Sequence, residues 1–252
     1  MKIVVIGGTG LIGSQVVSRL KTEGHEVVAA SPNTGVNAVT GEGLAEALKG
    51  ATVVVDVANS PSFADDAVLD FFVRAGGNLA AAEKAAGVSH HVALSVVGTE
   101  RLLDSGYFRA KLAQEELIAS SGIPWTLVRA TQFFEFAGAI AGAATVHGVT
   151  RATSRAIQPV ASADVAALVA DVALAAPLNG MIEIAGPEKM PVAKLVKLYF
   201  ESIGEPKDVL VDDAAGYFGT NIDDRSLTPD SGARISEKRF GDWVAAQPPR
   251  AA

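Results

Sequence analysis

The sequence contains no cysteine, which excludes disulfide bonds, thiolate nucleophiles and cysteine-ligated zinc sites. Basic residues are in the minority, because 21 Lys and Arg stand against 28 Asp and Glu and give a net charge of -7. Binding to a phosphate backbone needs a basic face, so we expect no nucleic-acid partner. The G-x-S-x-G motif is also missing, which excludes the serine hydrolases that depend on it.

Long apolar runs are missing as well. The longest uncharged apolar stretch, FAGAIAGAATVHGVT from Phe136, is too short and, at His147, too polar to span a bilayer. The opening MKIVVI reaches the first glycines after four apolar residues, which is too short a run for a signal peptide. We therefore expect a cytoplasmic protein without a membrane partner.

What the sequence does have is an alternation of short β-branched runs with helical patterns. Hydrophobic residues make up 49% and charged residues 19% of 252 positions, which suits a sheet buried on both faces. The predicted strands are KIVVI, EVVAA, TVVVDV, HVALSVV and WTLVRA. The predicted helices cover about 11–23, 43–49, 63–87 (with an optional break at Gly76-Gly77), 106–121, 163–175 and 191–203. This order predicts an α/β fold, a Rossmann-type doubly wound parallel sheet.

No Pro, Gly or Ser linker divides the chain, so we expect one domain over residues 1–252. Its core is expected at about 1–130. The less regular segments at about 131–155 and 186–245 are expected to form a small C-terminal subdomain that covers the carboxyl ends of the strands, where such sheets bind ligands. The tail, 247–252, is expected to be disordered.

A glycine loop follows the first strand. GGTGLIGS satisfies G-x-G-x-x-G at Gly8, Gly10 and Gly13, and G-x-x-G-x-x-G at Gly7, Gly10 and Gly13. Between a strand and an amphipathic helix, this loop gives a pyrophosphate close backbone approach, free N–H groups and a positive helix end. A tight turn without a ligand is the alternative. The expected cofactor contacts are Gly7, Thr9, Gly10, Leu11, Ile12 and Gly13.

The end of the second strand bears on the choice of cofactor. Asp or Glu there would hold the adenosine ribose of NAD and repel a 2′-phosphate, but this chain has Ser31 and Asn33, followed by Thr34. This favours NADP(H) over NAD(H), with Ser31 and Asn33 as cofactor contacts. Arg19 on the first helix either reaches the phosphate or is a solvated helix charge.

The helix from DSGYFRAKLAQEEL places Tyr107 and Lys111 four residues apart on one face, twelve residues after Ser95. These three side chains suit hydride transfer to a carbonyl. Tyr107 would donate the proton, Lys111 would lower the Tyr107 pKa and bind the cofactor ribose, and Ser95 would orient the carbonyl. Each has a structural alternative, namely a rim tyrosine, a solvated lysine and a satisfied strand hydroxyl.

The motifs GGTGLIG, DVANSP, NLAAAEKAAGVSHHVALS, YFRAK and WTLVRATQFFEF, with QPVASADVA and MIEIAGPE, resemble the NmrA-like atypical short-chain dehydrogenase/reductases over nearly the whole chain. The resemblance implies a Rossmann fold with bound NAD(P) and the same roles for Ser95, Tyr107 and Lys111. It also implies cofactor contacts near the adenosine from Val57, Ala58 and Asn59, and near the nicotinamide from Ala130, Thr131, Gln132 and Phe133. Many members of the group lack the tyrosine and act as redox sensors, whereas this chain keeps it.

Other residue patterns say less about the function. Phe133, Phe134 and Phe136 form either the core or the apolar wall of a substrate pocket. Asn78 is expected to brace its helix. His90 and His91 point to opposite sides of a strand and cannot share a metal ion, so no metal is expected. Asp164 is expected to favour a helix N-terminus, with Ser162 as a cap.

The sequence thus favours an NAD(P)H-dependent short-chain dehydrogenase/reductase that acts on a small-molecule carbonyl or quinone, and it leaves a homodimer open. Two alternatives stay in view. One is a non-catalytic NAD(P)-binding redox sensor. The other, weaker alternative is a nucleotide-sugar epimerase, for which the roughly 120 residues after WTLVRA leave little room.

Overall fold

The computed structural model describes residues 1–247 and divides into two compact units. Unit 1 comprises Met1–Arg129 and Ala163–Ile182, and unit 2 comprises Ala130–Ser162 and the chain from Glu183 onward. The chain therefore passes between the units three times. The predicted disordered tail lies outside the described residues, except for residue 247.

A seven-stranded sheet is built from β1 (Lys2–Ile6), β2 (Glu26–Ala30), β3 (Val53–Asp56), β4 (His90–Val96), β5 (Trp125–Ala130), β9 (Gly180–Ala185) and β12 (Arg234–Ile235). Its order is β12-β9-β5-β4-β3-β1-β2. β1 pairs in parallel with both β2 and β3, with Ile3 opposite Val27 on one side and Val53 on the other. The order reverses between β1 and β3, and such a switch point is where doubly wound sheets bind ligands. The predicted strands and fold class are confirmed.

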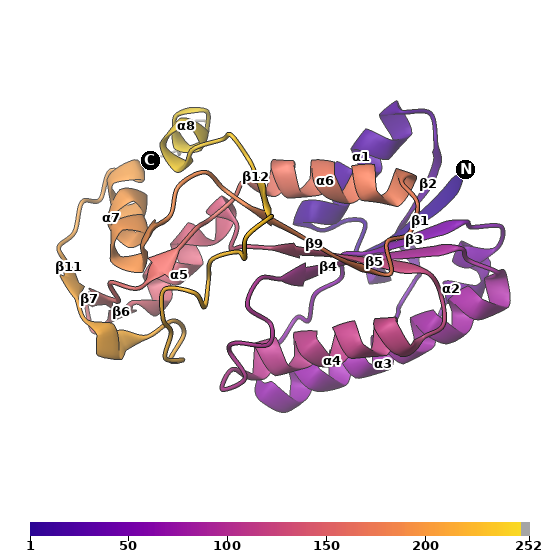
Figure 1. Ribbon diagram of the computed structural model, residues 1–252, viewed down its shortest axis with the longest axis horizontal. Helices are drawn as coiled ribbons and strands as arrows, with labels where there is room; N and C mark the ends of the chain where they lie inside the picture. Colours follow the sequence, from indigo (N-terminus) through magenta and orange to yellow (C-terminus); the bar gives the residue numbers. More distant parts are fainter. Residues whose placement is uncertain (248–252) are drawn as a thin grey trace. The chain divides into compact units, whose positions relative to one another are not determined.

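Helices cover both faces of the sheet in unit 1 (Figure 1). On one face α3 (Asp65–Ala86) and α4 (Gly106–Ser120) lie side by side, and on the other lie α1 (Leu11–Thr22) and α6 (Ser162–Leu174). The short α2 (Leu44–Leu48) follows a 3-10 turn, η1 (Pro32–Thr34). The predicted helices are confirmed to within two residues, and α3 continues unbroken through Gly76-Gly77. A Cβ on Gly76 would lie 3.4 Å from the Leu117 side chain of α4, an ordinary van der Waals contact, so α3 packs directly on α4 at this point.

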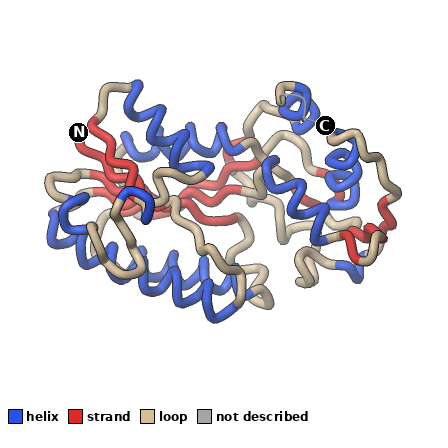
Figure 2. Tube along the Cα trace, turned by 180° about the vertical axis from the view of Figure 1, so that it is seen from behind, coloured by secondary structure: helices blue, strands red, loops and turns tan. Residues whose placement is uncertain are grey.

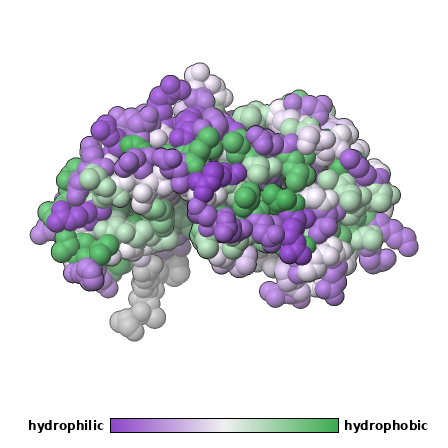
Figure 3. Space-filling view, turned by 90° about the horizontal axis from the view of Figure 1, so that it is seen from below, coloured by the Kyte–Doolittle hydropathy of each residue, from purple (hydrophilic) through white to green (hydrophobic). Residues whose placement is uncertain are grey.

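The outer face of α3 and α4 is mixed in character. Figure 3 views the molecule from this side and shows apolar side chains among hydrophilic ones. Leu69 and Val73 of α3 are exposed, and Asp70 and Arg74 of the same helix form an exposed ion pair one turn apart. No helix within residues 1–247 is both long and apolar enough to cross a membrane.

Unit 2 contains smaller elements (Figure 2). β6 (Thr145–Val146), β7 (Val149–Ala152) and β11 (Val209–Val211) form a three-stranded sheet, and β8 (Ala156–Ile157) pairs with β10 (Met190–Pro191). The helices are α5 (Ala137–Ala143), α7 (Val192–Ser202) and α8 (Phe240–Ala245), with 3-10 turns η2 (Phe134–Phe136) and η3 (Asp213–Ala215). Only α7 was predicted. α5 and α8 have seven and six residues, too few for helical periodicity to stand out.

Candidate cofactor and active site

The glycine loop is shaped by close backbone contacts. Gly7 has φ of +76°, and a Cβ on it would lie 2.9 Å from the Ala58 backbone. A Cβ on Gly13 would lie 2.1 Å from the Gly7 carbonyl oxygen. The loop therefore sits directly against both the first turn of α1 and the segment after β3. Val57 and Ala58, expected beside the cofactor, lie at this loop.

The start of α1 is open to an anion. Gly10 is the N-cap and contributes no capping side chain, and the first turn holds no acidic residue. The N–H groups of a first helical turn have no acceptor within the helix and carry a partial positive charge. A Cβ on Gly10 would make a tight contact with the Gly7 oxygen at 3.3 Å and would meet no other heavy atom within 4 Å. Thr9, Leu11 and Ile12 lie in this stretch, so the residues present fit a pyrophosphate.

The segment after β2 is stabilised by its own hydroxyl groups. Ser31 is buried, and its backbone N–H donates to Thr34 Oγ1 at 2.9 Å. Thr34 Oγ1 in turn donates to the Ala29 or Ser31 carbonyl oxygen. Asn33 is exposed beside them. Arg19 forms ion pairs with Asp171 at 2.9 Å and Glu23 at 3.2 Å, which agrees with the interpretation of a surface helix charge.

Lys111 points into the interior of unit 1. Its Nζ donates to the Leu94 carbonyl oxygen at 2.8 Å and to Gln114 Oε1, and it lies 4.5 Å from the centre of the Phe72 ring. Gln114 Nε2 donates to Asp56 Oδ2 at 2.8 Å, at the end of β3. Burial lowers the pKa of Lys111 to about 8, and the nearby carboxylates partly oppose that shift. The lysine thus links α4 to the ends of two strands.

Tyr107 lies one turn earlier on α4 and is partly buried. Its ring packs against Phe63, with centroids 5.6 Å apart, and against the Phe72 cluster that Lys111 also touches. Burial raises the pKa of Tyr107 to about 12. The expectation that Lys111 lowers this pKa is therefore not met in this structure, because desolvation dominates at the phenol and the ammonium group is directed elsewhere.

Ser95 belongs to a buried ionic network. Its hydroxyl donates to Glu115 Oε1 at 2.5 Å. Glu115 also accepts two hydrogen bonds from Arg129, at 3.0 and 2.6 Å, and Arg129 reaches Glu100 at 2.7 Å. Burial alone would lower the pKa of Arg129, but the two carboxylates outweigh it and raise that pKa. The hydroxyl hydrogen of Ser95 is thus donated to Glu115 rather than offered to a ligand.

The residues after β5 fall in unit 2. Thr131 is buried, its N–H donates to the Ile184 carbonyl and its hydroxyl to the Gln158 carbonyl at 2.6 Å. Gln132 is also buried, and among the described residues its Oε1 has no hydrogen-bond partner. An unpaired amide oxygen at a buried position is costly unless a ligand or water satisfies it. This atom therefore fits the expectation that the segment meets a cofactor.

The three phenylalanines separate into two groups. Phe134 is buried and packs edge-on against Phe240 and at a tilt against Trp243, with ring centroids 5.4 and 5.8 Å apart. It is therefore a core residue of unit 2, which is the first of the two alternatives given for these phenylalanines. Phe133 and Phe136 stack on each other at 5.3 Å, and Phe136 is exposed.

Sequence reasoning missed Asp56, Gln114, Glu115 and Arg129. All four are buried, and polar or charged side chains are buried only when they are paired. The available signal was QEE, which follows Lys111 at helical spacing and places Gln114 and Glu115 one turn from it. Asn78 braces the fold as expected, since its Nδ2 donates to the Ala38 and Val39 carbonyls at 2.9 Å.

Residues 7–176 match a protein family described as NAD(P)H-binding. The chain belongs to this NAD(P)H-binding family. The matched region begins in the glycine loop and includes Ser95, Tyr107 and Lys111.

The chain is similar in sequence to a bacterial reductase and to a photosystem II assembly factor. A (4-alkanoyl-5-oxo-2,5-dihydrofuran-3-yl)methyl phosphate reductase from Streptomyces griseus is 33% identical over 163 residues, which cover 60% of this chain and 54% of that protein. The photosystem II assembly factor Ycf39 of Cyanophora paradoxa is 28% identical over 149 residues, covering 54% of this chain and 46% of that protein. The chain spans about half the length of these relatives.

Solved structures share the fold at low sequence identity. A dTDP-4-dehydrorhamnose reductase from Clostridium acetobutylicum superposes with a TM-score of 0.75 at 16% identity, covering 97% of this chain and 98% of that one. An NADPH-dependent quinone oxidoreductase from Escherichia coli, complexed with NADPH, gives 0.71 at 22% identity, covering 96% and 98%. Both likenesses extend over nearly the whole of this chain.

Proposed function

We propose that this protein is an NAD(P)H-dependent oxidoreductase of the short-chain dehydrogenase/reductase type that reduces a carbonyl or quinone. The observation that carries the proposal is the glycine loop, where Gly7 and Gly13 lie too close to neighbouring backbone for any side chain and the start of α1 has no capping side chain and no acidic residue, which suits a pyrophosphate. The names of the Streptomyces griseus reductase and the Escherichia coli quinone oxidoreductase support a reductase of small molecules. The NmrA-like subgroup is part of this proposal.

When bound, the nicotinamide cofactor supplies the hydride, and the chain must then protonate the substrate oxygen. Tyr107 is our proton donor. Its phenol is neutral and can donate a proton, although burial raises its pKa to about 12 and makes it a weaker acid than a free tyrosine. Transfer to an alkoxide is favourable because an alkoxide is a stronger base than a phenolate. Lys111 has two of its three donor hydrogens in use, and we propose the third for the cofactor ribose.

Ser95 can orient a substrate only if its hydroxyl first leaves Glu115. To orient a carbonyl, its hydroxyl would have to turn away from Glu115, which would keep its bonds to Arg129. We therefore propose Ser95 as an orienting residue only with that exchange. A Ser95→Ala variant that keeps normal turnover would assign Ser95 to the buried network alone.

NADP(H) is our preferred cofactor. The exposed end of the segment after β2 presents Asn33 and no carboxylate, so nothing there repels a 2′-phosphate. Asp56, the last residue of β3, already accepts hydrogen bonds from Gln114 and from the Ala58 N–H. We propose that Ser31 and Asn33 lie at the adenosine ribose.

The test is a titration of the full chain with NADPH and NADH, followed by a turnover screen with ketones, aldehydes and quinones. Tyr107→Phe should keep cofactor affinity within about twofold and lower kcat by at least about a hundredfold. Tyr199→Phe in α7 is the matched control and should change neither quantity. Equal kcat for wild type and Tyr107→Phe would remove Tyr107 from the mechanism.

A redox sensor is the second candidate. It is favoured by the raised pKa of Tyr107 and by the engagement of Ser95 with Glu115, neither of which prepares a catalytic site. A sensor should bind NADPH and NADP⁺ with affinities that differ by about tenfold or more and should reduce no substrate in the screen. Turnover that depends on Tyr107 would exclude this candidate.

A further inference from the structure

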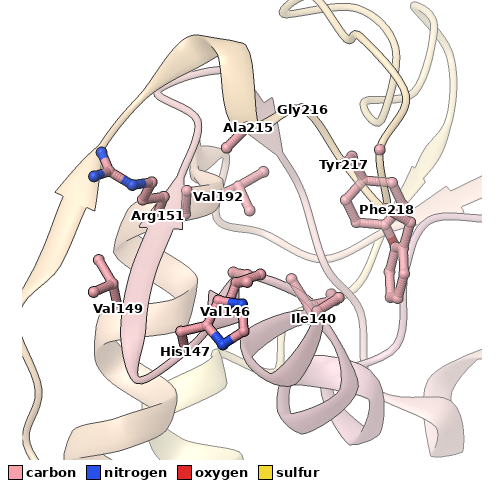
Figure 4. Close-up of a pocket in the computed structure, with 14 residues that line it drawn as sticks. Ile140, Val146, His147, Val149, Arg151, Val192, Ala215, Gly216, Tyr217 and Phe218 are labelled. Carbon is pink, nitrogen blue, oxygen red and sulfur yellow. The ribbon is translucent and has the colours of Figure 1, made fainter.

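A cavity of about 520 Å³ lies entirely within unit 2 (Figure 4). α5, the β6–β7 hairpin, the start of α7 and the loop after η3 surround it. Aliphatic side chains form most of its wall, including Ile140, Ala143, Val149 and Val192. Its size is in the range of small-molecule sites. It contains no residue proposed above for cofactor binding or catalysis.

Two tight turns place rings at this cavity. His147-Gly148 joins β6 to β7, and Phe218-Gly219 joins Tyr217 to Thr220, which exchange two backbone hydrogen bonds. In both turns the two central residues have positive φ, with His147 at +50° and Phe218 at +47°. This is the type I′ turn, whose first central position is normally Asn, Asp or Gly.

Phe218 is the more unusual of the two. A bulky residue with positive φ is a backbone outlier, whereas histidine tolerates this conformation better. The phenyl ring gains little from burial in return, because Phe218 is 59% exposed. The preceding Gly216 fixes the loop, since a Cβ on it would lie 2.4 Å from the Thr220 carbonyl oxygen. Strained residues that folding does not require are typical of binding sites.

Charge at the cavity is of one sign. Among its lining residues Arg151 is the only Lys or Arg, and none is Asp or Glu. Its nearest carboxylate is Asp212, at 3.6 Å, and that side chain also accepts a hydrogen bond from the Ala214 N–H. An exposed pair at this distance is weak, so Arg151 can exchange Asp212 for another anion. Val146 at the rim is 61% exposed, which leaves apolar surface for a ligand to cover.

We propose that this cavity binds a small aliphatic anion, either a carboxylate or a phosphate monoester. Its alkyl chain lies among Ile140, Ala143 and Val192, and its acid group pairs with Arg151. Phe218 closes over the chain at the mouth. None of its lining residues takes part in the proposed hydride transfer, so binding is expected even in a protein that has no reductase activity.

Isothermal titration of the full chain with sodium octanoate, kept below its micelle concentration, tests the proposal. Saturable binding at one site per chain is expected, and Arg151→Gln should weaken it by about tenfold or more. Arg155→Gln is the matched control, because Arg155 is a similarly exposed arginine of unit 2 that pairs with Asp213 outside the cavity lining. It should keep affinity within about twofold.

Two further measurements separate the parts of the proposal. Octanol should bind at least about tenfold more weakly than octanoate, and octyl phosphate should bind at least as well as octanoate. Phe218→Asn puts a favoured residue in the turn and removes the ring, so it should raise Tm slightly while weakening octanoate binding severalfold. No saturable octanoate binding, equal binding of octanol, or full binding by Arg151→Gln would overturn the assignment.

Discussion

Three glycine substitutions test whether Gly13, in the first turn of α1, is needed for close backbone packing and Gly10, in the loop before it, for binding the cofactor. The third, Gly77→Ala, is the control. Gly13→Ala places a methyl group 2.1 Å from the Gly7 oxygen and 2.7 Å from the Gly8 Cα. Real Cβ contacts essentially never fall below 3.0 Å, so backbone atoms must separate by roughly 0.9 Å. Overpacking costs about 1 to 3 kcal/mol. Because both neighbours are backbone, we expect about 3 kcal/mol, or a Tm lower by roughly 6 to 12 °C.

Gly10→Ala should behave differently. Gly10 has φ of -80° and ψ of -177°, which alanine adopts freely, and its Cβ would meet only the Gly7 oxygen at 3.3 Å. Stability should therefore change by less than about 1 kcal/mol. The new methyl would stand before the open N–H groups of α1, where we place the pyrophosphate. NADPH affinity should fall by about tenfold or more.

Gly77→Ala is the matched control. It lies inside α3, and a Cβ there would have no neighbour within 4 Å. Alanine should stabilise the helix by about 0.5 to 1 kcal/mol and leave cofactor affinity unchanged. Calorimetric Tm values and NADPH fluorescence titrations of the three variants check the set. A Gly10→Ala protein that binds NADPH like wild type, or a Gly13→Ala protein with wild-type Tm, would refute this account of the loop.

Three other predictions concern buried charge and the cofactor. His90 has its pKa lowered to about 4 by burial and then by His91, so the unfolded chain takes up its proton first. The free energy of unfolding should therefore fall by about 3 kcal/mol between pH 6.5 and 4. In urea unfolding measured across this pH range, His90→Gln should lack this part of the pH dependence. Glu115→Gln leaves the buried Arg129 guanidinium poorly paired and should cost about 3 to 5 kcal/mol, whereas Glu100→Gln, at the exposed end, should cost less than about 1 kcal/mol; equal losses in urea unfolding would count against the network. Asn33→Asp adds one negative charge at constant shape, so it should weaken NADPH binding severalfold and leave NADH binding unchanged. If the ratio of NADPH affinity to NADH affinity stays the same, the 2′-phosphate does not lie at Asn33.

The sheet and the long helices were predictable because their sequence signals are local. The strands from β1 to β5 are short β-branched runs, and α3 carries periodic apolar residues such as Val68, Phe72, Ala75 and Leu79 along its 22 positions. Short elements of unit 2 escaped, because strands of two to four residues are too short for an alternating pattern to stand out. The β6–β7 hairpin could have been found from VHGV, since a central glycine between valines indicates a two-residue turn.

The site was predictable in outline but not in its contacts. Glycine spacing locates the loop, yet the partner of Gln114 is Asp56, 58 residues earlier. Phe134 is covered by Phe240 and Trp243, more than 100 residues later. Such pairings follow from which strand ends and helices the fold brings together, and residue spacing carries no record of them.

One helix collects most of the polar chemistry of unit 1. Through Gln114, Lys111 and Glu115, α4 makes hydrogen bonds to Asp56 at the end of β3, to Leu94 and Ser95 in β4, and to Arg129 in β5. These side chains are buried and hold the helix against the carboxyl ends of three strands, so their loss should lower stability as well as turnover. Tyr107 is carried by the same helix but has an aromatic contact where the others have ionic ones. The Tyr107→Phe variant should therefore lose turnover and keep its stability. That difference separates a group that reacts from groups that position it.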